Sequence, residues 1–438
     1  MWNKSIALVL ISSSFLFGCS TGEESTEVDS STEVACTLSL DGEWRAVLTS
    51  PGGELPFGLR FATEGEGLAA VVLNGAEEAP VSGVNCSGDE VVVHFAWYDS
   101  EITAASAGDE VLEGQWRRTS PGGEDTVMAF RANRDADVRF RAVDGSGEGS
   151  GGPAMAVESV HGEWAVLFVD EDGEEEAVGD FSQGPSGEVE GTFLTPVGDY
   201  RFLAGDFGEG RLRLSTFDGA HAFLFQAQVQ ADGTLAGDFW SRDSYHATWT
   251  AHTVGEAEEV LPDPWEMAHL TNDEGLFRFE FPDTEGQLVA HDDPRFENKV
   301  LLVNIFGTWC PNCNDEAPHL AEWHRRYRDE GFEIVGLAYE FTGDPDRDRE
   351  MLRRFADRHG IEYPLLLAGT SDKQDAAATL PDLSAVIAYP TSLFIGRDGK
   401  VRKIHTGFSG PGTGAKYGAL LAELEGTIEK LLAQPVGS

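Results

Sequence analysis

Two patterns of hydrophobic and polar positions divide the chain. Between residues 38 and 252, short runs rich in Val, Leu, Phe and Trp are interrupted by Gly and Asp, and helical periodicity is almost absent. Residues 211–214 alternate polar and apolar side chains as a half-buried strand does, and Asp218-Gly219 then indicates a tight turn. We therefore expect antiparallel β-structure throughout this region.

The β region repeats itself. The triplet Gly-Glu-Trp at 42–44 recurs 120 positions later at 162–164, and residues 112–116 resemble residues 235–239. Each copy reads as a meander of about six or seven strands. The copies could form two sandwiches, two small barrels or two halves of one larger barrel, and the sequence leaves these three arrangements open.

The second copy contains the clearest predicted hairpin. Residues 191–194 run into Gly198-Asp199, which we expect to turn the chain into a strand at 200–203. His221 and His246 lie on predicted strands, and we expect both to be hydrogen-bonded structural residues, because neither has metal ligands at a suitable spacing.

The C-terminal part follows a different pattern, typical of an α/β fold. Residues 299–306 are almost continuously apolar, as in a central strand buried on both faces. Further strands are predicted at 277–281, 392–395 and 401–404, and helices at 315–329, 346–359 and 419–432. The predicted segments are a signal peptide (1–18), an acidic tether (19–36), β repeat 1 (37–143), a linker (144–157), β repeat 2 (158–253), a linker (254–270) and the α/β domain (271–436).

The charge of the chain excludes one class of partner. Asp and Glu number 76 against 31 Lys and Arg, which gives a formal net charge of −45. Such a surface repels phosphate backbones, so we expect no nucleic-acid partner.

The N-terminus has the pattern of an exported protein. Lys4 precedes a short apolar run at 6–17, and the run ends in Leu-Phe-Gly-Cys at 16–19. This resembles the bacterial lipobox, which implies lipidation of Cys19 and a stable membrane anchor. Ser20 after the cysteine favours the outer membrane. The expected location is the cell envelope, facing the periplasm.

Export would bring the chain into an oxidising compartment, where disulfides persist. Cys36 lies directly before the first β repeat and Cys86 lies within it. We expect them to form a structural disulfide, because the remaining two cysteines of the folded part form a separate motif.

That motif is Trp-Cys-Pro-Asn-Cys at residues 309–313, placed between the central strand and a predicted helix. Cys310 would lie at the helix N-terminus, where unpaired N–H groups and the helix dipole favour a thiolate, so it is the expected nucleophile. Cys313, almost one turn further on, would resolve a mixed disulfide with the substrate. Pro311 suits the first helical position.

Strand, Trp-Cys-x-x-Cys and helix together resemble the TlpA/ResA-like thiol–disulfide oxidoreductases, which have a thioredoxin fold. Pro318 and the sequence Tyr389-Pro390-Thr391 before a strand agree with that family over residues 277–432. The resemblance implies a cis Pro390 beside the cysteines and Trp309 packed under the active site. It also implies protein disulfides as substrates and a membrane electron donor.

The resemblance further implies a proton acceptor for Cys313. Thioredoxin places a buried Asp six residues before its first cysteine, but Asn304 occupies that position here and cannot titrate. Glu316, three residues after Cys313, matches the acidic residue of the TlpA/ResA-like pattern. We expect Glu316 to accept the proton; the alternative is a surface carboxylate that stabilises the helix N-terminus.

The predicted function is therefore a membrane-anchored periplasmic thiol–disulfide oxidoreductase that reduces protein disulfides without cofactor or metal. Three alternatives compete with it. The β repeats could be a binding module with an accessory redox domain. A thiol peroxidase would need a Pro and a Thr or Ser where Val303 and Gly307 stand. A zinc site would need two ligands beyond Cys310 and Cys313.

Overall fold

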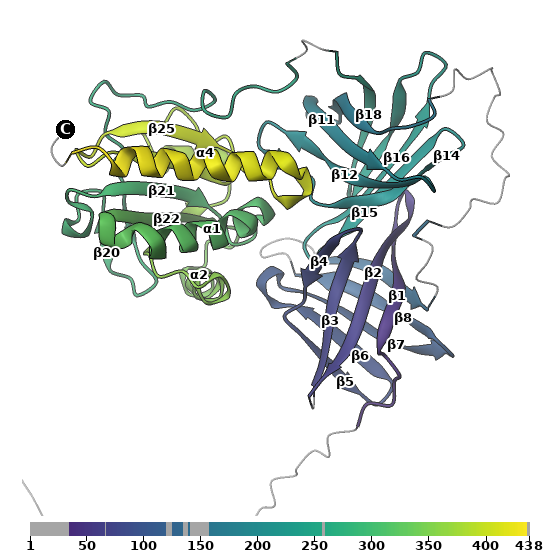
Figure 1. Ribbon diagram of the computed structural model, residues 1–438. Coiled ribbons are helices and arrows are strands. Elements are labelled where there is room, and N and C mark those ends of the chain that lie inside the picture. Colours follow the sequence, from purple (N-terminus) through teal and green to yellow (C-terminus); the bar gives the residue numbers. More distant parts are fainter. Residues whose placement is uncertain are drawn as a thin grey trace, which may run out of the picture.

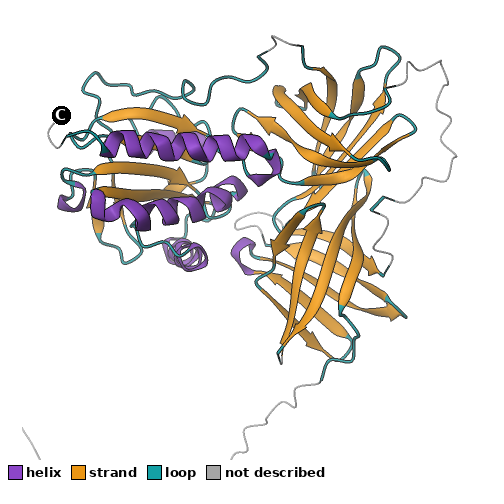
Figure 2. Ribbon diagram, viewed as in Figure 1, coloured by secondary structure: helices purple, strands orange, loops and turns teal. Residues whose placement is uncertain are grey.

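The computed structural model describes residues 35–65, 67–119, 125–134, 139–140, 157–255 and 259–435. The predicted signal peptide, Cys19 and most of the linker at 144–157 lie outside these residues. Figure 1 shows two β modules stacked on each other, with an α/β domain beside them. Figure 2 shows that nearly all helices belong to the α/β domain.

The first β module is a strongly curved nine-stranded antiparallel sheet with the order β4-β3-β2-β1-β9-β8-β7-β6-β5. Cys36 and Cys86 form a disulfide that joins the segment before β1 to β5, with their Cα atoms 5.2 Å apart. The strands are β1 (Gly42–Ser50), β2 (Gly53–Glu64), β3 (Gly67–Asn74), β4 (Glu77–Pro80), β5 (Gly83–Ser87), β6 (Glu90–Phe95), β7 (Ser100–Gly108), β8 (Val111–Arg118) and β9 (Thr126–Asn133).

The second β module is a closed barrel, because β11 pairs with β12 in addition to β10. Its aromatic core includes the stacked rings of Phe225 and Phe239, 4.2 Å apart. The strands are β10 (Gly162–Val169), β11 (Glu174–Gln183), β12 (Glu188–Thr195), β13 (Gly198–Asp199), β14 (Leu203–Gly208), β15 (Arg211–Phe217), β16 (Ala222–Val229), β17 (Leu235–Ser241) and β18 (Tyr245–Thr253).

The two modules share details that support a duplication. In each, the first strand pairs with both the second and the last strand of its module. The indole N–H of Trp44 donates to the carbonyl of Leu40 at 2.8 Å, and that of Trp164 donates to Val160 at 2.9 Å. The same local packing therefore recurs at an offset of 120 residues.

Two details of the predicted β region were wrong. Each module has nine strands rather than six or seven, since several short edge strands escape the hydrophobic pattern. The predicted strand at 200–203 is absent: Gly198–Asp199 is itself the short strand β13, and Arg201 has a left-handed backbone with φ of 65°. The side chain of Arg201 is thereby directed out of the barrel, with consequences described below.

The two β modules pack through an aromatic side chain. Phe217, at the end of β15, is fully buried among rings of the first module, with Phe57 at 4.5 Å and Trp116 at 5.3 Å between centroids. Asn74 of β3 bonds both backbone polar groups of Phe217, at 2.8 and 3.1 Å. Burial of this ring in the neighbouring core fixes one module on the other.

The α/β domain has a five-stranded mixed sheet in the order β23-β22-β21-β24-β25. Residues 277–281 were predicted as an edge strand, but the strand observed there is Glu280–Pro282 (β19), which pairs with β20 (Leu288–Ala290). The other elements are β21 (Val300–Phe306), α1 (Pro311–Tyr327), β22 (Phe332–Glu340), α2 (Pro345–His359), β23 (Leu365–Thr370), α3 (Lys373–Thr379), β24 (Thr391–Ile395), β25 (Val401–Thr406) and α4 (Ala415–Leu432).

Helix α1 lies between α4 and α2 on one side of the sheet (Figure 1). The hydroxyl of Tyr327 on α1 donates to Glu425 and Glu429 on α4, both at 2.9 Å. On the other side of α1, Asn314 accepts hydrogen bonds from Arg358 and His359 of α2. All seven residues of β21 are buried, so this central strand holds the N-terminus of α1 in a fixed place.

Candidate active site

Cys310 is the N-cap residue of α1, directly after the central strand. Its Sγ accepts a hydrogen bond from the Cys313 backbone N–H at 3.4 Å, and its thiol faces the carbonyl oxygen of Tyr389 at 3.3 Å. The first N–H groups of a helix have no partner within the helix, so the structure offers a donor and the positive end of a dipole to a thiolate at this place.

Cys313 lies deeper than Cys310. Their side chains are only 2% and 4% exposed, and both cysteines are in the free thiol form. Burial raises the pKa of the Cys313 thiol well above its ordinary value, and the neighbouring Cys310 adds to this. Cys313 therefore needs a base before it can attack a mixed disulfide.

Glu316 is the buried carboxyl on the same helix, one turn after Cys313. It accepts hydrogen bonds from the side-chain amide of Asn304 at 2.8 Å and the hydroxyl of Ser392 at 3.2 Å. Burial raises its pKa to about 7, against a lowering effect of these two bonds. The residue is not a surface carboxylate, and Asn304, where thioredoxin has an acid, instead orients Glu316.

The loop before β24 closes the site from the side. The Tyr389–Pro390 peptide bond is cis, and the Tyr389 carbonyl faces Cys310. The indole N–H of Trp309 donates to the carbonyl of Tyr339 at 2.9 Å, and its ring contacts those of Phe341 and Tyr389. Trp309 and Tyr389 thus form aromatic walls next to the nucleophile.

Sequence reasoning missed a second buried carboxyl, Glu340 at the end of β22. It accepts hydrogen bonds from the backbone N–H of Thr308 at 2.9 Å and from its hydroxyl at 2.7 Å. Burial raises the pKa of Glu340 to about 8. These bonds fix the turn that leads from β21 into the cysteine motif. The sequence signal for Glu340 was only an acidic residue at the end of an apolar run.

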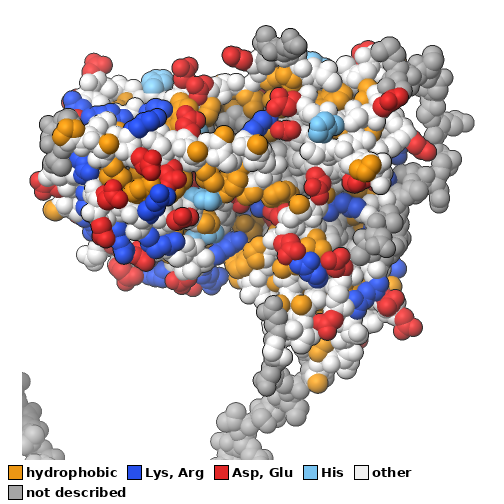
Figure 3. Space-filling view, viewed as in Figure 1, with side chains coloured by type: hydrophobic (Ala, Val, Ile, Leu, Met, Phe, Trp, Pro, Cys, Tyr) orange, Lys and Arg blue, Asp and Glu red, His pale blue; other side chains and the backbone are white. Residues whose placement is uncertain are grey.

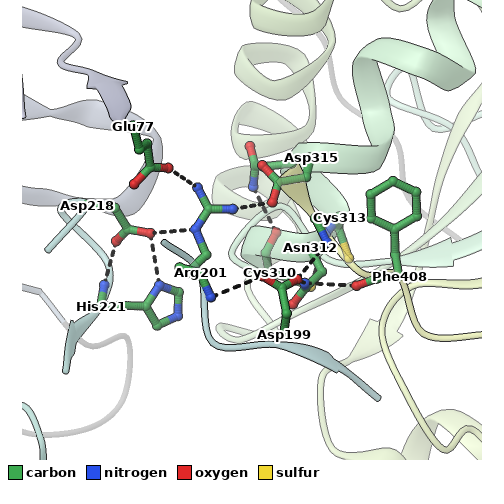
Figure 4. Close-up of polar contacts among 12 residues, drawn as sticks. Glu77, Asp199, Arg201, Asp218, His221, Cys310, Asn312, Cys313, Asp315 and Phe408 are labelled. Carbon is green, nitrogen blue, oxygen red and sulfur yellow. Dashed lines mark hydrogen bonds and ion pairs between the residues drawn. The ribbon is translucent and has the colours of Figure 1, made fainter. Parts of the chain in front are cut away.

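The second β barrel reaches into the redox motif. Asn312, between the two cysteines, donates from Nδ2 to Asp199 Oδ1 at 2.7 Å and to the Phe408 carbonyl at 2.9 Å. Asp199 also accepts from the backbone N–H of Gly410 at 2.6 Å. A side chain of β13 is therefore part of the rim around Cys310 (Figure 4).

Arg201 joins all three parts of the molecule. Figure 4 shows its guanidinium between Glu77 of the first module, Asp218 of the second and Asp315 of α1. The Glu77 contact is 2.9 Å and the Asp218 contact 3.4 Å, and Asp315 is also bonded. Burial raises the pKa of Asp315 to about 7, against the attraction of Arg201. No local sequence pattern indicates these partners.

His221 stands beside this cluster, in the turn before β16. Its Nδ1 lies 3.0 Å from Asp218 Oδ2, and burial lowers the pKa of His221. His246 pairs with Asp238 at 2.8 Å on the barrel surface. Both histidines have hydrogen-bonded structural partners, and within the described ranges no cluster of three or more His, Cys, Asp or Glu residues could hold a metal ion.

A cavity of about 250 Å³ lies between the barrel and the dithiol. Cys310, Pro311 and Asn312 line one wall. The remaining lining combines apolar and aromatic residues with six charged or polar ones, namely Glu175, Thr195, Asp199, Arg201, His221 and Lys373. The cavity is lined from the barrel side by Thr195, Val197, Gly198, Tyr200 and Phe223, among others, and from the α/β side by Trp309, Ala388 and Tyr389.

Other predicted residues lie away from this site or outside the description. Cys36 and Cys86 are in the first β module and line none of the active-site cavity. Cys19 is among the residues not described. In the described part of the chain, no helix combines the length and apolar composition needed to cross a membrane.

Comparison with known proteins agrees with this geometry. Residues 272–421 match the Redoxin family. The C-terminal part of the chain is a Redoxin domain with a thioredoxin fold. The expected fold class, antiparallel β repeats followed by an α/β thioredoxin fold, is thus confirmed.

The curated relatives of this Redoxin domain carry the name thiol-disulfide oxidoreductase ResA. The protein from Halalkalibacterium halodurans is 28% identical over 134 residues, which is 31% of this chain and 68% of the relative. That from Geobacillus thermodenitrificans is 31% identical over 129 residues, 30% of this chain and 66% of the relative. That from Bacillus thuringiensis is matched over 62% of its length, at 29% identity. The Redoxin domain is thus similar in sequence to thiol-disulfide oxidoreductases of this name.

Solved structures similar to the chain match part of its length. A thioredoxin-family thiol:disulfide interchange protein from Chlorobium tepidum is 20% identical and covers 36% of this chain and 96% of its own, with a TM-score of 0.29. A DsbF homologue from Corynebacterium diphtheriae is 17% identical and covers 41% and 98%, with the same TM-score.

Proposed function

We propose that the chain is a thiol–disulfide oxidoreductase of the periplasm that reduces protein disulfides through Cys310 and Cys313. One observation carries the proposal: the nucleophile is the N-cap of α1, and a buried carboxyl with a pKa near neutrality lies one turn behind the resolving thiol. This arrangement provides a thiolate, a second thiol and a proton acceptor in the order that disulfide exchange requires.

In the first step the Cys310 thiolate attacks one sulfur of the substrate disulfide. A mixed disulfide forms, and the other substrate sulfur leaves as a thiolate, which takes a proton from water. The N–H of Cys313 and the helix dipole stabilise the attacking thiolate.

In the second step Glu316 takes the proton of Cys313. The Cys313 thiolate attacks Cys310 Sγ, which breaks the mixed disulfide and releases the second substrate thiolate. The substrate has gained two electrons, and the enzyme is left with a Cys310–Cys313 disulfide. An external dithiol must return two electrons before the next cycle.

The location and the electron source belong to the same proposal. Lipidation at Cys19 would anchor the chain, with the outer membrane favoured, and the acidic segment 19–36 would act as a tether. A membrane-bound dithiol donor would return the electrons. No cofactor or metal is needed for this chemistry.

Single-turnover exchange tests the proposal. The reduced full chain is mixed with insulin or a disulfide peptide, and enzyme oxidation is followed by tryptophan fluorescence. Cys310→Ser should abolish the reaction, whereas Cys313→Ser should stop at a mixed disulfide that mass spectrometry detects. Equal activity in Cys310→Ser would overturn the proposal.

The redox potential tests the direction. Equilibration with dithiothreitol or glutathione buffers should give a value near that of thioredoxin, roughly −270 mV. A value near that of DsbA, roughly −120 mV, would instead identify an oxidant that installs disulfides.

A further inference from the structure

The β barrel of the second module lies against the face of the redox motif on which Cys310 borders the cavity. Its β13 segment is bonded to the residue between the two cysteines through Asp199 and Asn312, and Gly198 forms an isolated β-bridge with Phe408 beside the cis-Pro loop. The approach is close: a Cβ on Gly198 would come within 2.9 Å of the Asn312 side chain. We call residues 197–201 the barrel cap.

Several further contacts hold the barrel cap against the α/β domain. The Arg201 guanidinium bonds Asp315 of α1, four residues after Pro311. Lys416 at the start of α4 bonds Glu163 and Asp180 of the barrel, at 2.6 and 2.8 Å. The cap is therefore bonded to α1, and the barrel that carries it is bonded to α4 as well.

A cavity of about 250 Å³ lies between the cap and Cys310. Ligand pockets for drug-sized molecules begin at about 300 Å³, so this space fits a few side chains rather than the surface of a folded domain. A disulfide on a rigid globular surface cannot bring its sulfur to Cys310, which is 4% exposed, without moving the barrel.

The cavity has apolar side chains on both of its walls. The apolar lining comes from both sides, with Val197, Tyr200 and Phe223 of the barrel facing Trp309, Ala388 and Tyr389 of the redox domain. The lining contains two acids, Glu175 and Asp199, and two bases, Arg201 and Lys373, so its formal charges sum to zero and favour neither an anionic nor a cationic ligand. An apolar side chain gains from burial here, whereas a polar one loses its hydration.

We propose that the barrel cap makes this enzyme selective for cysteines in extended polypeptide segments that carry an apolar residue next to the cysteine. Folded proteins and small polar disulfides are then poor substrates. This inference rests on the proposed function, since it assigns a substrate class to the Cys310–Cys313 site. The second β module is thus part of the substrate site.

The test uses four symmetrical disulfides and the reduced full chain. Two are homodimers of unstructured pentapeptides, Gly-Leu-Cys-Leu-Gly and Gly-Ser-Cys-Ser-Gly; the others are glutathione disulfide and a folded domain dimerised through a surface cysteine. Each second-order rate constant is divided by that of dithiothreitol with the same disulfide, which removes differences in intrinsic reactivity.

The leucine peptide should react at least about tenfold faster than the serine peptide or glutathione disulfide after this normalisation, as expected for one side chain in an apolar pocket. The folded dimer should be slowest. In Asp199→Ala, the folded dimer should react faster and the leucine-to-serine ratio should fall. Asp206→Ala, an acid of β14 outside the cavity, is the matched control and should keep the wild-type pattern.

Val197→Ser is a second test variant, which keeps the hydrogen bonds and ion pairs of the cap. It should lower the leucine-to-serine ratio without changing the rate of the folded dimer. Equal normalised rates for all four disulfides in the wild-type chain would overturn the inference while leaving the proposed function in place. No reaction with any of them would overturn the proposed function itself.

Discussion

The side chain of Asn312, between the two redox cysteines, donates a hydrogen bond to Asp199 of the second β barrel at 2.7 Å. A residue 113 positions earlier in the chain thus contacts the middle of the Cys-Pro-Asn-Cys motif. The β module and the redox domain consequently share one site, and the behaviour of the dithiol depends on residues from both. The following predictions test that site and the contacts that support it.

Glu316→Gln should remove the proton acceptor of Cys313. In the wild-type chain the rate of the second step should rise with pH through about 7, as Glu316 loses its own proton. In the variant this inflection should vanish and the rate at pH 7 should fall by about 10². The measurement is the decay of a mixed disulfide formed at Cys310. Glu322→Gln, an exposed acid on the same helix, should behave as wild type; an inflection retained in Glu316→Gln would contradict the assignment.

Glu316 should also make the redox domain less stable as the pH rises. The folded chain holds the Glu316 proton up to about pH 7, whereas the unfolded chain releases it near pH 4.5. Unfolding therefore becomes easier between these values, by up to about 3 kcal/mol. Glu316→Gln should be more stable than wild type at pH 8 and equal to it at pH 4. Hydrogen exchange of the β21 amides measures this, and a difference that grows toward low pH would contradict it.

Arg201→Met should destabilise the junction of the three parts. Without the guanidinium, the carboxyl groups of Glu77, Asp218 and Asp315 stay largely buried with no cation between them. Removal of one partner from a buried ion cluster costs about 3–5 kcal/mol. The measurement is the denaturant midpoint of the first unfolding transition. Arg131→Ala removes an exposed pair with Glu113 and should cost less than about 1 kcal/mol; equal effects would contradict the prediction.

Loss of the Cys36–Cys86 disulfide should affect the first β module alone. The bond closes a loop with a sequence separation of 50, for which the chain-entropy relation gives about 4 kcal/mol. The double variant Cys36→Ala, Cys86→Ala should unfold this module at lower denaturant, as followed by hydrogen exchange of β5 and β6. Thiol–disulfide exchange at Cys310 should keep its wild-type rate, and a large loss there would show that the bond supports the active site.

The chemistry of the site could be predicted because it is local in sequence. The apolar run at 299–306, the cysteine spacing and the following helical pattern all lie within 30 residues, and each residue type has a chemical reason for its place. Strand β21 and helix α1 form there. The domain limits stay predictions. The roles of Glu316 and Trp309 also stay predictions, because the structure gives the positions of these side chains and not their part in the reaction.

The surroundings of the site could not be predicted, because they depend on contacts between distant segments. Arg201 was expected in a strand, yet its backbone is left-handed and its side chain joins residues from three parts of the fold. The pattern of apolar residues indicates which side chains are buried, but it does not indicate which distant residues they contact. Glu340 was likewise unremarkable in sequence, since only the fold brings it to Thr308. Figure 3 shows acidic and basic side chains interspersed over one face of the molecule. The net charge of the chain therefore does not indicate which of these groups form ion pairs.

The duplicated modules use equivalent aromatic positions toward different neighbours. Phe217 of the second module is buried in the first, while Trp97, 120 residues earlier, stacks under Arg358 of α2 at 3.9 Å. The second module contacts α1 through Arg201. Each of the three parts, the two β modules and the α/β domain, therefore contacts the other two. Because the three contacts form a closed triangle, any two of these parts are held together both directly and through the third. The position of the second module beside Cys310 thus depends on the first module as well, although no described residue of the first module lines the active-site cavity.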